Sequence, residues 1–412
     1  MKKKMWVLGL AALCAGVLTV GLVGCGDGDG GETTDDGTHN YDQHTFVDGV
    51  CVCGADELVY TLSEDGTYYI VTKATAGMSL TTGNLVIPDT YKEKPVREIA
   101  DQAFHGYRNI TGITIGDNVT KIGVQAFTLC NKVTNVDLGS GLETIERSAF
   151  EQCEKLEAVT LPESIKTIGD SAFRNTPIKE ITLPYTVETV GKGVFDSNKA
   201  LTYAKINGND TEFDGTPFTG CTNLAKVTFE SSVTRIDDEL LLGCTGLTVV
   251  EWSDNVKSIG KKAFSGCSAL TSVSLPYGLE TIGDGAFSAT GLTEIVIPNT
   301  VETVGKSAFS GCASLTSATL SIKMTVIEDY TFKGTGFTSY TVPDGIQYIN
   351  PLAFQDCTAL ASVIIPKSVK GIYRAFSGSG LTDVYYKGSW TEWGEIELSD
   401  STVQKATMHY DV

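Results

Sequence analysis

Cysteine and histidine supply the side chains best suited to chemistry in this chain of 412 residues. Four of them, His39, His44, Cys51 and Cys53, lie close together near the N-terminus. Imidazole nitrogen and thiolate sulfur are the usual ligands of zinc, but structural zinc sites generally place at least two residues between paired cysteines. Only Val52 separates Cys51 from Cys53. We therefore favour a spacer with a redox-active or bridged cysteine pair, with zinc as the alternative, and we expect no other cofactor.

A second set of cysteines recurs at regular intervals, three residues after a repeated aromatic position: Cys130, Cys153, Cys221, Cys244, Cys267, Cys312 and Cys357. In stacked repeats their Cα atoms would lie about 5 Å apart, within disulfide range. The same position elsewhere holds a small polar residue: Thr176, Asn198, Thr290, Thr335 or Ser379. We therefore favour buried thiols that act as small hydrophobic groups, and leave a disulfide between adjacent pairs such as Cys130 and Cys153 open.

The sequence does not predict catalysis. It contains no GxSxG, HExxH or phosphate-binding loop. Carboxylates are abundant, yet Glu180 and Glu294 recur at equivalent solvent-facing strand positions, which is typical of solvated repeats. We expect no enzyme, and a secreted hydrolase is the least favoured hypothesis.

The N-terminus predicts export. Three lysines at positions 2–4 precede an apolar stretch at positions 5–23, as in a secretory signal. The residues LVGC at positions 22–25 resemble the bacterial lipobox, whose cysteine is acylated and becomes the first residue. We therefore expect a lipoprotein signal peptide over 1–24, lipidation of Cys25 and a flexible acidic tether over 25–50. An uncleaved membrane anchor is the alternative.

The charge of the chain disfavours nucleic acid as a partner. The formal net charge is −19 at pH 7, whereas binding to a phosphate backbone needs clustered lysine and arginine. Acidity of this kind keeps an exposed surface protein soluble. Together with the N-terminus, it predicts an extracytoplasmic location, on the membrane surface of the cell envelope.

One repeated unit must position all of these residues. The phrase LTSVSLPYGLETIGDGAF, which ends at Phe287, recurs with small changes. Its last residue, the landmark, falls at steps of 22 or 23 residues on Phe104, Phe127, Phe150, Phe173, Phe195, Phe218, Leu241, Phe264, Phe287, Phe309, Phe332, Phe354 and Phe376. Apolar and polar residues alternate from Leu270 to Leu275, which predicts a strand buried on one face. Since one unit cannot bury its apolar side alone, the units should stack into a solenoid.

This unit resembles the LxxVxLPxxVxxIGxxAFxxCxx repeat of BspA-like bacterial surface proteins, the LRR_5 class of leucine-rich repeats. The resemblance covers about Leu85 to Tyr386. It implies an α/β solenoid, a right-handed superhelix with a parallel β-sheet on one face and irregular or short helical segments on the other. It also implies a cell-surface role, often attachment to host matrix proteins.

The flanking segments predict caps for the two ends of the solenoid. We expect an N-terminal cap with a β-hairpin over 51–83, because strand-like residues flank the turn at 63–66. The leucine-rich-repeat solenoid should then span 84–386, with about 13 repeats. A C-terminal cap should span 387–412, in which Trp390 and Trp393 shield the edge of the core rather than bind a sugar.

The outward strand positions suggest where a partner would bind. Serine and threonine dominate them, as suits exposed strands. Only the middle of the array differs, with Tyr203, Lys205, Lys226, Val249 and Glu251. Aromatic and charged side chains on an otherwise plain hydroxyl surface are the better contact candidates. The irregular repeat at 206–215 lies nearby; we attribute it to drift, with a ligand-facing loop of weak calcium affinity as the alternative.

These features predict a lipid-anchored surface protein that binds extracellular or host surface proteins or glycans, with adhesion as the favoured role. The alternative is a structural or assembly scaffold of the envelope, whose partner would be bacterial.

Overall fold

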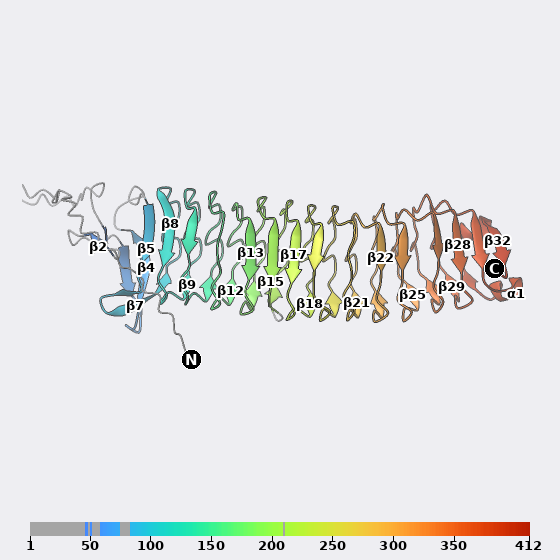
Figure 1. Cartoon of the computed structure of the whole chain (residues 1–412), viewed down its shortest axis with the longest axis horizontal. Helices are drawn as coiled ribbons and strands as arrows, with labels where there is room; N and C mark the ends of the chain where they lie inside the picture. Colours follow the sequence, from blue (N-terminus) through green and yellow to red (C-terminus); the bar gives the residue numbers. More distant parts are fainter. Residues whose placement is uncertain (1–45, 48–49, 52–57, 75–82, 209–210) are drawn as a thin grey trace, which may run out of the picture.

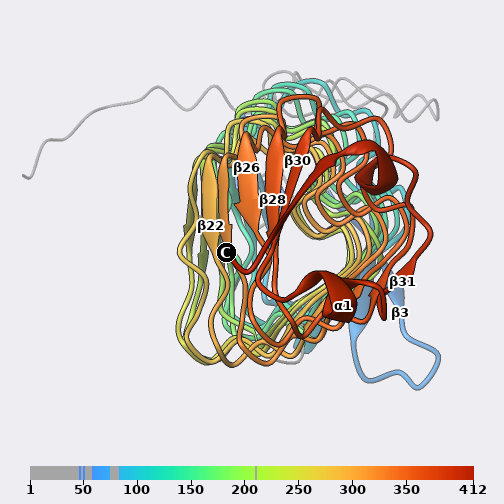
Figure 2. The ribbon, with the colours of Figure 1, turned by 90° about the vertical axis from the view of Figure 1, so that its right-hand side faces the viewer.

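The computed structural model describes residues 46–47, 50–51, 58–74, 83–208 and 211–412. The chain winds into a long rod of about 14 stacked turns, with its strands running across the rod (Figure 1). Seen from the C-terminal end, strands lie on two sides of each turn (Figure 2). The predicted leucine-rich-repeat solenoid is confirmed.

The first strand position of each turn forms what we call the long-strand column. It is divided into several sheets, and within each sheet neighbouring strands pair in parallel, for example with Tyr203 opposite Lys226 and Lys226 opposite Val249. The column consists of β5 (Gly83–Ile87), β8 (Ile110–Ile115), β10 (Asn135–Asp137), β13 (Glu180–Leu183), β15 (Tyr203–Ile206), β17 (Lys226–Phe229), β19 (Val249–Glu251), β22 (Glu294–Val296), β24 (Ser317–Thr319), β26 (Ser339–Thr341), β28 (Ser362–Ile365), β30 (Asp383–Tyr386) and β32 (Thr407–Tyr410).

The second strand position forms the short-strand column, whose strands also pair in parallel, as in Thr144 opposite Thr167. After β7 (Lys94–Ile99) it holds two-residue strands: β9 (Lys121–Ile122), β11 (Thr144–Ile145), β12 (Thr167–Ile168), β14 (Thr189–Val190), β16 (Glu212–Phe213), β18 (Arg235–Ile236), β20 (Ser258–Ile259), β21 (Thr281–Ile282), β23 (Thr303–Val304), β25 (Val326–Ile327), β27 (Tyr348–Ile349), β29 (Gly371–Ile372) and β31 (Glu397–Leu398).

Tight turns, rather than helices, form the third side of the solenoid. Two residues after every landmark the backbone is left-handed, as at Leu129 (φ 64°) and Gly243 (φ 73°). Glycine adopts this conformation without a steric cost, which explains its frequency there. The landmark N–H donates to the next turn, for example Phe127 to the Ala149 oxygen at 2.8 Å. Among the described residues the helical part is minor: α1 (Trp390–Trp393) and the 3₁₀ segment Val403–Lys405.

The landmark residues form the centre of the core. All thirteen have no exposed surface, and successive phenylalanine rings stack with centroids 5.1 to 5.9 Å apart. Leu241 divides this column of rings into two stacks. Stacked aromatic rings bury a large apolar area in each turn, so each repeat is stabilised by its neighbours.

Different elements close the two ends. At the N-terminal end, β3 (Leu58–Leu62) and β4 (Tyr69–Ala74) form an antiparallel hairpin, and β4 pairs with β7. The short strand β6 (Thr90–Tyr91) also pairs with β7, and β1 (Phe46–Val47) with β2 (Val50–Cys51). At the C-terminal end, Trp393 packs edge-on against Tyr386, with ring centroids 5.1 Å apart. Trp390 was also expected to shield the edge of the core, but its side chain is 70% exposed and does not do so.

Candidate binding surface

The five residues singled out in the sequence lie side by side on the long-strand column. Tyr203 and Lys205 belong to β15, Lys226 to β17, and Val249 and Glu251 to β19. The register aligns Tyr203, Lys226 and Val249 in one row across the three strands. We call these five residues the central cluster.

Ion pairs join the turns within the central cluster. The Lys226 ammonium lies 2.8 Å from a Glu251 oxygen and 5.7 Å from the centre of the Tyr203 ring. The Lys205 ammonium lies 2.7 Å from a carboxylate oxygen of Glu230. These side chains span adjacent turns, so the stacking of the repeats fixes their positions before any partner arrives.

Both kinds of charge in the cluster are stabilised by their neighbours. Hydrogen bonds from Lys226 and Thr228 lower the pKa of the Glu251 carboxyl, and the hydrogen bond to Glu230 raises the pKa of Lys205. The pKa shifts of Glu251 and Lys205 therefore both favour the charged form. Together these side chains offer an aromatic ring, cations and carboxylates as contacts, but no activated nucleophile.

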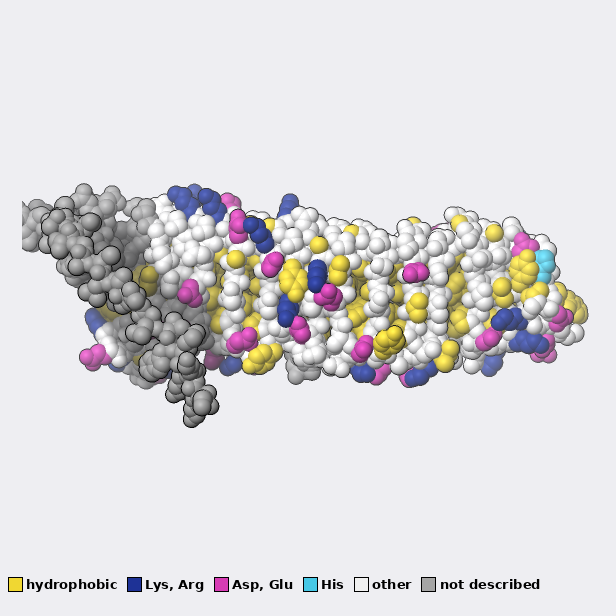
Figure 3. Space-filling view, viewed as in Figure 1, with side chains coloured by type: hydrophobic (Ala, Val, Ile, Leu, Met, Phe, Trp, Pro, Cys, Tyr) yellow, Lys and Arg dark blue, Asp and Glu magenta, His cyan; other side chains and the backbone are white. Residues whose placement is uncertain are grey.

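The exposed face around the cluster is mostly uncharged. Figure 3 shows isolated charged and apolar side chains on a surface of small polar residues, with several of them gathered in the middle of the rod. Val249 is 42% exposed, and Tyr277 and Val296 are more so. Tyr277, Val296 and the neighbouring Trp252 were not predicted from the sequence. The signal that could have found this region is the tryptophan at position 252, where the adjacent repeats hold Phe229 and Leu275.

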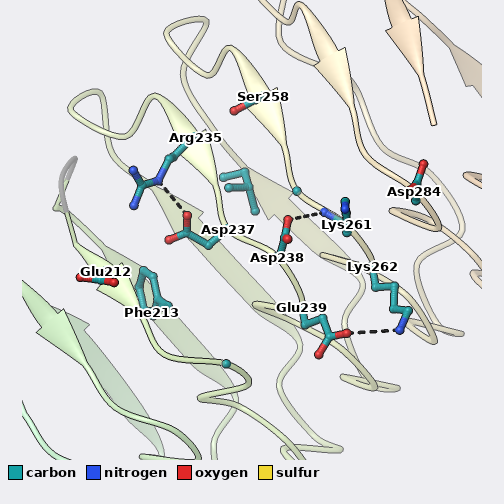
Figure 4. Close-up of a pocket in the computed structure, with 13 residues that line it drawn as sticks. Glu212, Phe213, Arg235, Asp237, Asp238, Glu239, Ser258, Lys261, Lys262 and Asp284 are labelled. Atoms are coloured by element: carbon teal, nitrogen blue, oxygen red, sulfur yellow. Dashed lines mark hydrogen bonds and ion pairs between the residues drawn. The ribbon is translucent and has the colours of Figure 1, made fainter.

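The irregular repeat borders a cleft of about 710 Å³ between β16 and β18 (Figure 4). Arg235 pairs with Asp237 at 2.7 Å, and Lys262 with Glu239 at 3.2 Å. Asp238 accepts a hydrogen bond from the main-chain N–H of Lys261. Burial raises the pKa of Asp237, although the Arg235 guanidinium opposes this shift. Asp237, Asp238 and Glu239 are therefore each engaged by a neighbouring group of the protein. Asp210, from the same irregular repeat, lies outside the described residues.

The seven repeat cysteines are buried and free. Each thiol donates to a main-chain carbonyl of the previous turn, as Cys130 does to the Phe104 oxygen at 3.3 Å. Thr290 and Thr335, at the same position, instead donate to the landmark carbonyl of their own turn at 2.9 Å. Burial raises the pKa of Cys130, Cys221 and Cys267 to about 12. The repeat cysteines are therefore buried free thiols, as predicted, and they also donate hydrogen bonds to the backbone.

The remaining predicted site residues fall in the N-terminal segment. Cys25, His39, His44 and Cys53 lie outside the described residues, and Cys51 is described only through its backbone pairing in β2. In the described ranges, no group of three or more His, Cys, Asp or Glu residues is arranged to hold a metal ion. No helix in the same ranges is long and apolar enough to cross a membrane.

Comparison with known proteins agrees with this geometry. A family model described as a BspA type leucine rich repeat region matches in six copies over residues 81–202, 195–309 and 280–403. A solved leucine-rich repeat protein from Bacteroides ovatus is similar with a TM-score of 0.65 and 24% identity, over 86% of this chain and 98% of that chain. A leucine rich cell surface protein from Faecalibacterium prausnitzii is similar with a TM-score of 0.42 and 23% identity, over 83% of this chain and 96% of that chain. The pneumococcal vaccine antigen PcpA is similar with a TM-score of 0.45 and 20% identity, over 86% of this chain and 97% of that chain. No curated protein matches the chain.

Proposed function

This chain belongs to the BspA type leucine-rich repeat family, and from that premise we propose that it is a lipid-anchored cell-surface protein that binds extracellular proteins or glycans, with adhesion as its role. Export and anchoring follow from the signal-like N-terminus and the lipobox-like residues that end at Cys25. The acidic segment that the sequence predicts as a tether behind Cys25 would hold the solenoid away from the membrane.

The observation that carries this proposal is the central cluster. Its aromatic ring and charges are aligned across three strands of one continuous sheet, so a partner would meet a surface that is already ordered. Preorganisation of this kind reduces the entropy that binding must overcome. Tyrosine is also enriched among the residues that dominate binding energies at interfaces.

The central cluster favours a binding role over a catalytic one. Lys226 and Glu251 neutralise each other at 2.8 Å, and the pKa of Glu251 is lowered rather than raised. A general acid at neutral pH would need the opposite shift. These groups therefore suit complementary contacts with a partner.

The test is capture of partners by the full chain displayed on intact cells, from a panel of matrix proteins and glycans. The double variant Tyr203→Ala, Lys226→Ala should lose the captured partner. The matched control Ser317→Ala, Ser339→Ala changes two exposed positions on the same column and should retain it. Uniform non-binding would contradict adhesion, and crosslinking that recovers only envelope proteins of the producing cell would favour a scaffold.

A further inference from the structure

Trp252 interrupts the long-strand column. Its slot in the adjacent turns holds Phe229 and Leu275, which are both buried, whereas Trp252 is only half-buried. Its indole N–H donates to the Ser274 carbonyl at 2.7 Å. The ring also packs edge-on against Phe264, with centroids 5.7 Å apart. The indole therefore bonds to the backbone of the next turn, where strand pairing would otherwise occur.

The sheet ends beside this contact. Thr228 pairs with Glu251, 23 residues further on, and the same step would place Ser274 opposite Glu251. Instead residues 271–275 form no strand, β19 ends one sheet and β22 begins another. In the described part of the chain, the main-chain N–H groups from Ser272 to Leu275 donate to no main-chain carbonyl. These main-chain N–H groups are therefore not bonded to carbonyl groups of the adjacent turns.

A groove of about 840 Å³ lies over this interrupted turn, and we call it the β19–β22 groove. Its walls include Val249 on one side and Val296 on the other, with Ser272 and Ser274 between them. Val296 is 62% exposed and Tyr277, at one edge, is 81% exposed. The groove thus combines apolar walls with polar groups along its floor.

Among the described residues that line the groove, Glu294 alone is charged. Among the ion pairs of the described residues it has none, in contrast to Glu251 and Glu230, which pair with Lys226 and Lys205. An exposed carboxylate without a cation, set among neutral groups, favours a positively charged ligand. Tyr277 adds an exposed aromatic ring at the edge, and ring faces attract cations.

We propose that the β19–β22 groove binds an extended segment of a partner polypeptide that carries a lysine or arginine between apolar residues. The apolar neighbours would cover Val249 and Val296, the cation would pair with Glu294, and the peptide backbone would bond to the unused main-chain groups. Main-chain hydrogen bonds supply affinity in recognition of extended peptides, and side-chain contacts supply specificity. The inference rests on the proposed binding function and deepens it by naming the chemistry of the bound segment.

The test uses the full chain and fluorescein-labelled decapeptides of serine and threonine with Val-Ser-Lys-Ser-Val or Val-Ser-Glu-Ser-Val at the centre, because alternate side chains of an extended peptide share one face. By fluorescence anisotropy, the lysine peptide should bind about tenfold more tightly than the glutamate peptide, and Glu294→Gln should bring this ratio close to one. The matched control is Glu180→Gln, which removes another exposed glutamate at the same strand position in β13. It should keep the tenfold ratio.

Two further arms make the result decisive. Val296→Ser should weaken binding of the lysine peptide while circular dichroism stays unchanged, because the side chain is exposed. Equal affinity for the two peptides, no binding of either, or a neutral oligosaccharide such as cellohexaose binding in their place would overturn the proposal. Partner capture that is lost only with Tyr203→Ala, Lys226→Ala would at the same time leave the proposed function standing, so the two can fail separately.

Discussion

The Asp400 side chain completes a hydrogen-bond ladder at the last landmark residue, Phe376. In the preceding turn, the landmark N–H of Phe354 donates to the main-chain oxygen of Ala375 at 2.8 Å. The N–H of Phe376 instead donates to a carboxylate oxygen of Asp400, also at 2.8 Å. The other oxygen of Asp400 accepts the N–H groups of Thr402 and Val403. One buried carboxylate therefore stands in for the backbone of a further turn.

Replacing Asp400 should loosen the C-terminal end. Asp400→Ala leaves the N–H groups of the buried Phe376 and Val403 and of the half-buried Thr402 without this acceptor, which should lower the free energy of unfolding by about 3 kcal/mol. Hydrogen exchange should show faster exchange at the Phe376 amide. The exposed Glu395→Ala in the same cap is the control. Unchanged protection at Phe376 in Asp400→Ala would show that another group closes the ladder.

The phenylalanine column should be the most sensitive part of the core. Phe264→Ala removes a fully buried ring that stacks on Phe287 at 5.2 Å, and should lower the free energy of unfolding by about 4 kcal/mol. Phe264→Leu should cost about 1 kcal/mol, because Leu241 already fills the equivalent slot. Urea denaturation followed by circular dichroism measures both. Equal losses in the two variants would contradict this view of the stack.

The buried thiols should make the protein less stable at alkaline pH. Burial raises the pKa of Cys130, Cys221 and Cys267 from the ordinary value of 9.0 to about 12. Above pH 9 the unfolded chain therefore loses protons that the folded chain keeps. The free energy of unfolding keeps its full value below pH 9. It should fall by about 1.4 kcal/mol per pH unit and per thiol as the pH rises from 9 toward 12.

Urea denaturation at pH 8.0, 9.0 and 10.0 measures this slope. The triple variant Cys130→Thr, Cys221→Thr, Cys267→Thr should make this slope less steep, because threonine occupies the same position in other turns without titrating. The four other buried thiols, whose pKa burial also raises, keep the rest of the slope. A slope that is the same in the variant and the natural protein would assign the pH dependence to other groups.

The interface between β16 and β18 should open more readily than the interface between β18 and β20. The Gly260 N–H donates to the Ile236 oxygen at 2.8 Å, but the equivalent N–H of Asp237 donates to no main-chain carbonyl in the described ranges, and β16 ends its sheet. In repeat proteins each turn is stabilised mainly by its neighbours. The Asp237 amide should therefore exchange at least about tenfold faster than the Gly260 amide. Equal protection in hydrogen-exchange mass spectrometry would rule out a weak interface here.

Much of the fold could be predicted from the sequence because the signal is repeated in every turn. The landmark Phe287 and its equivalents identify a core position that is buried throughout, and the alternation of apolar and polar residues identifies the outer positions of the long-strand column. The strand predicted from Leu270 to Leu275 is wrong, because residues 271–275 form no strand. The same alternation placed Tyr203, Lys226 and Val249 in one row. The expected helical segments proved minor, because left-handed residues such as Leu129 turn the chain too tightly for a helix to form.

The sequence by itself determined the solenoid and the order of side chains along its outer face, because a unit of 22 or 23 residues with one apolar side can bury that side only against its copies. Tertiary structure alone decided which groups remain available to a partner. Lys226 and Glu251 are far apart in the chain, yet they pair across adjacent turns, whereas Glu294 meets no cation. Trp252 reaches the carbonyl of Ser274 in the next turn and interrupts the sheet there. Contacts between turns depend on how side chains meet in three dimensions, and a repeat pattern read along one chain does not contain that information.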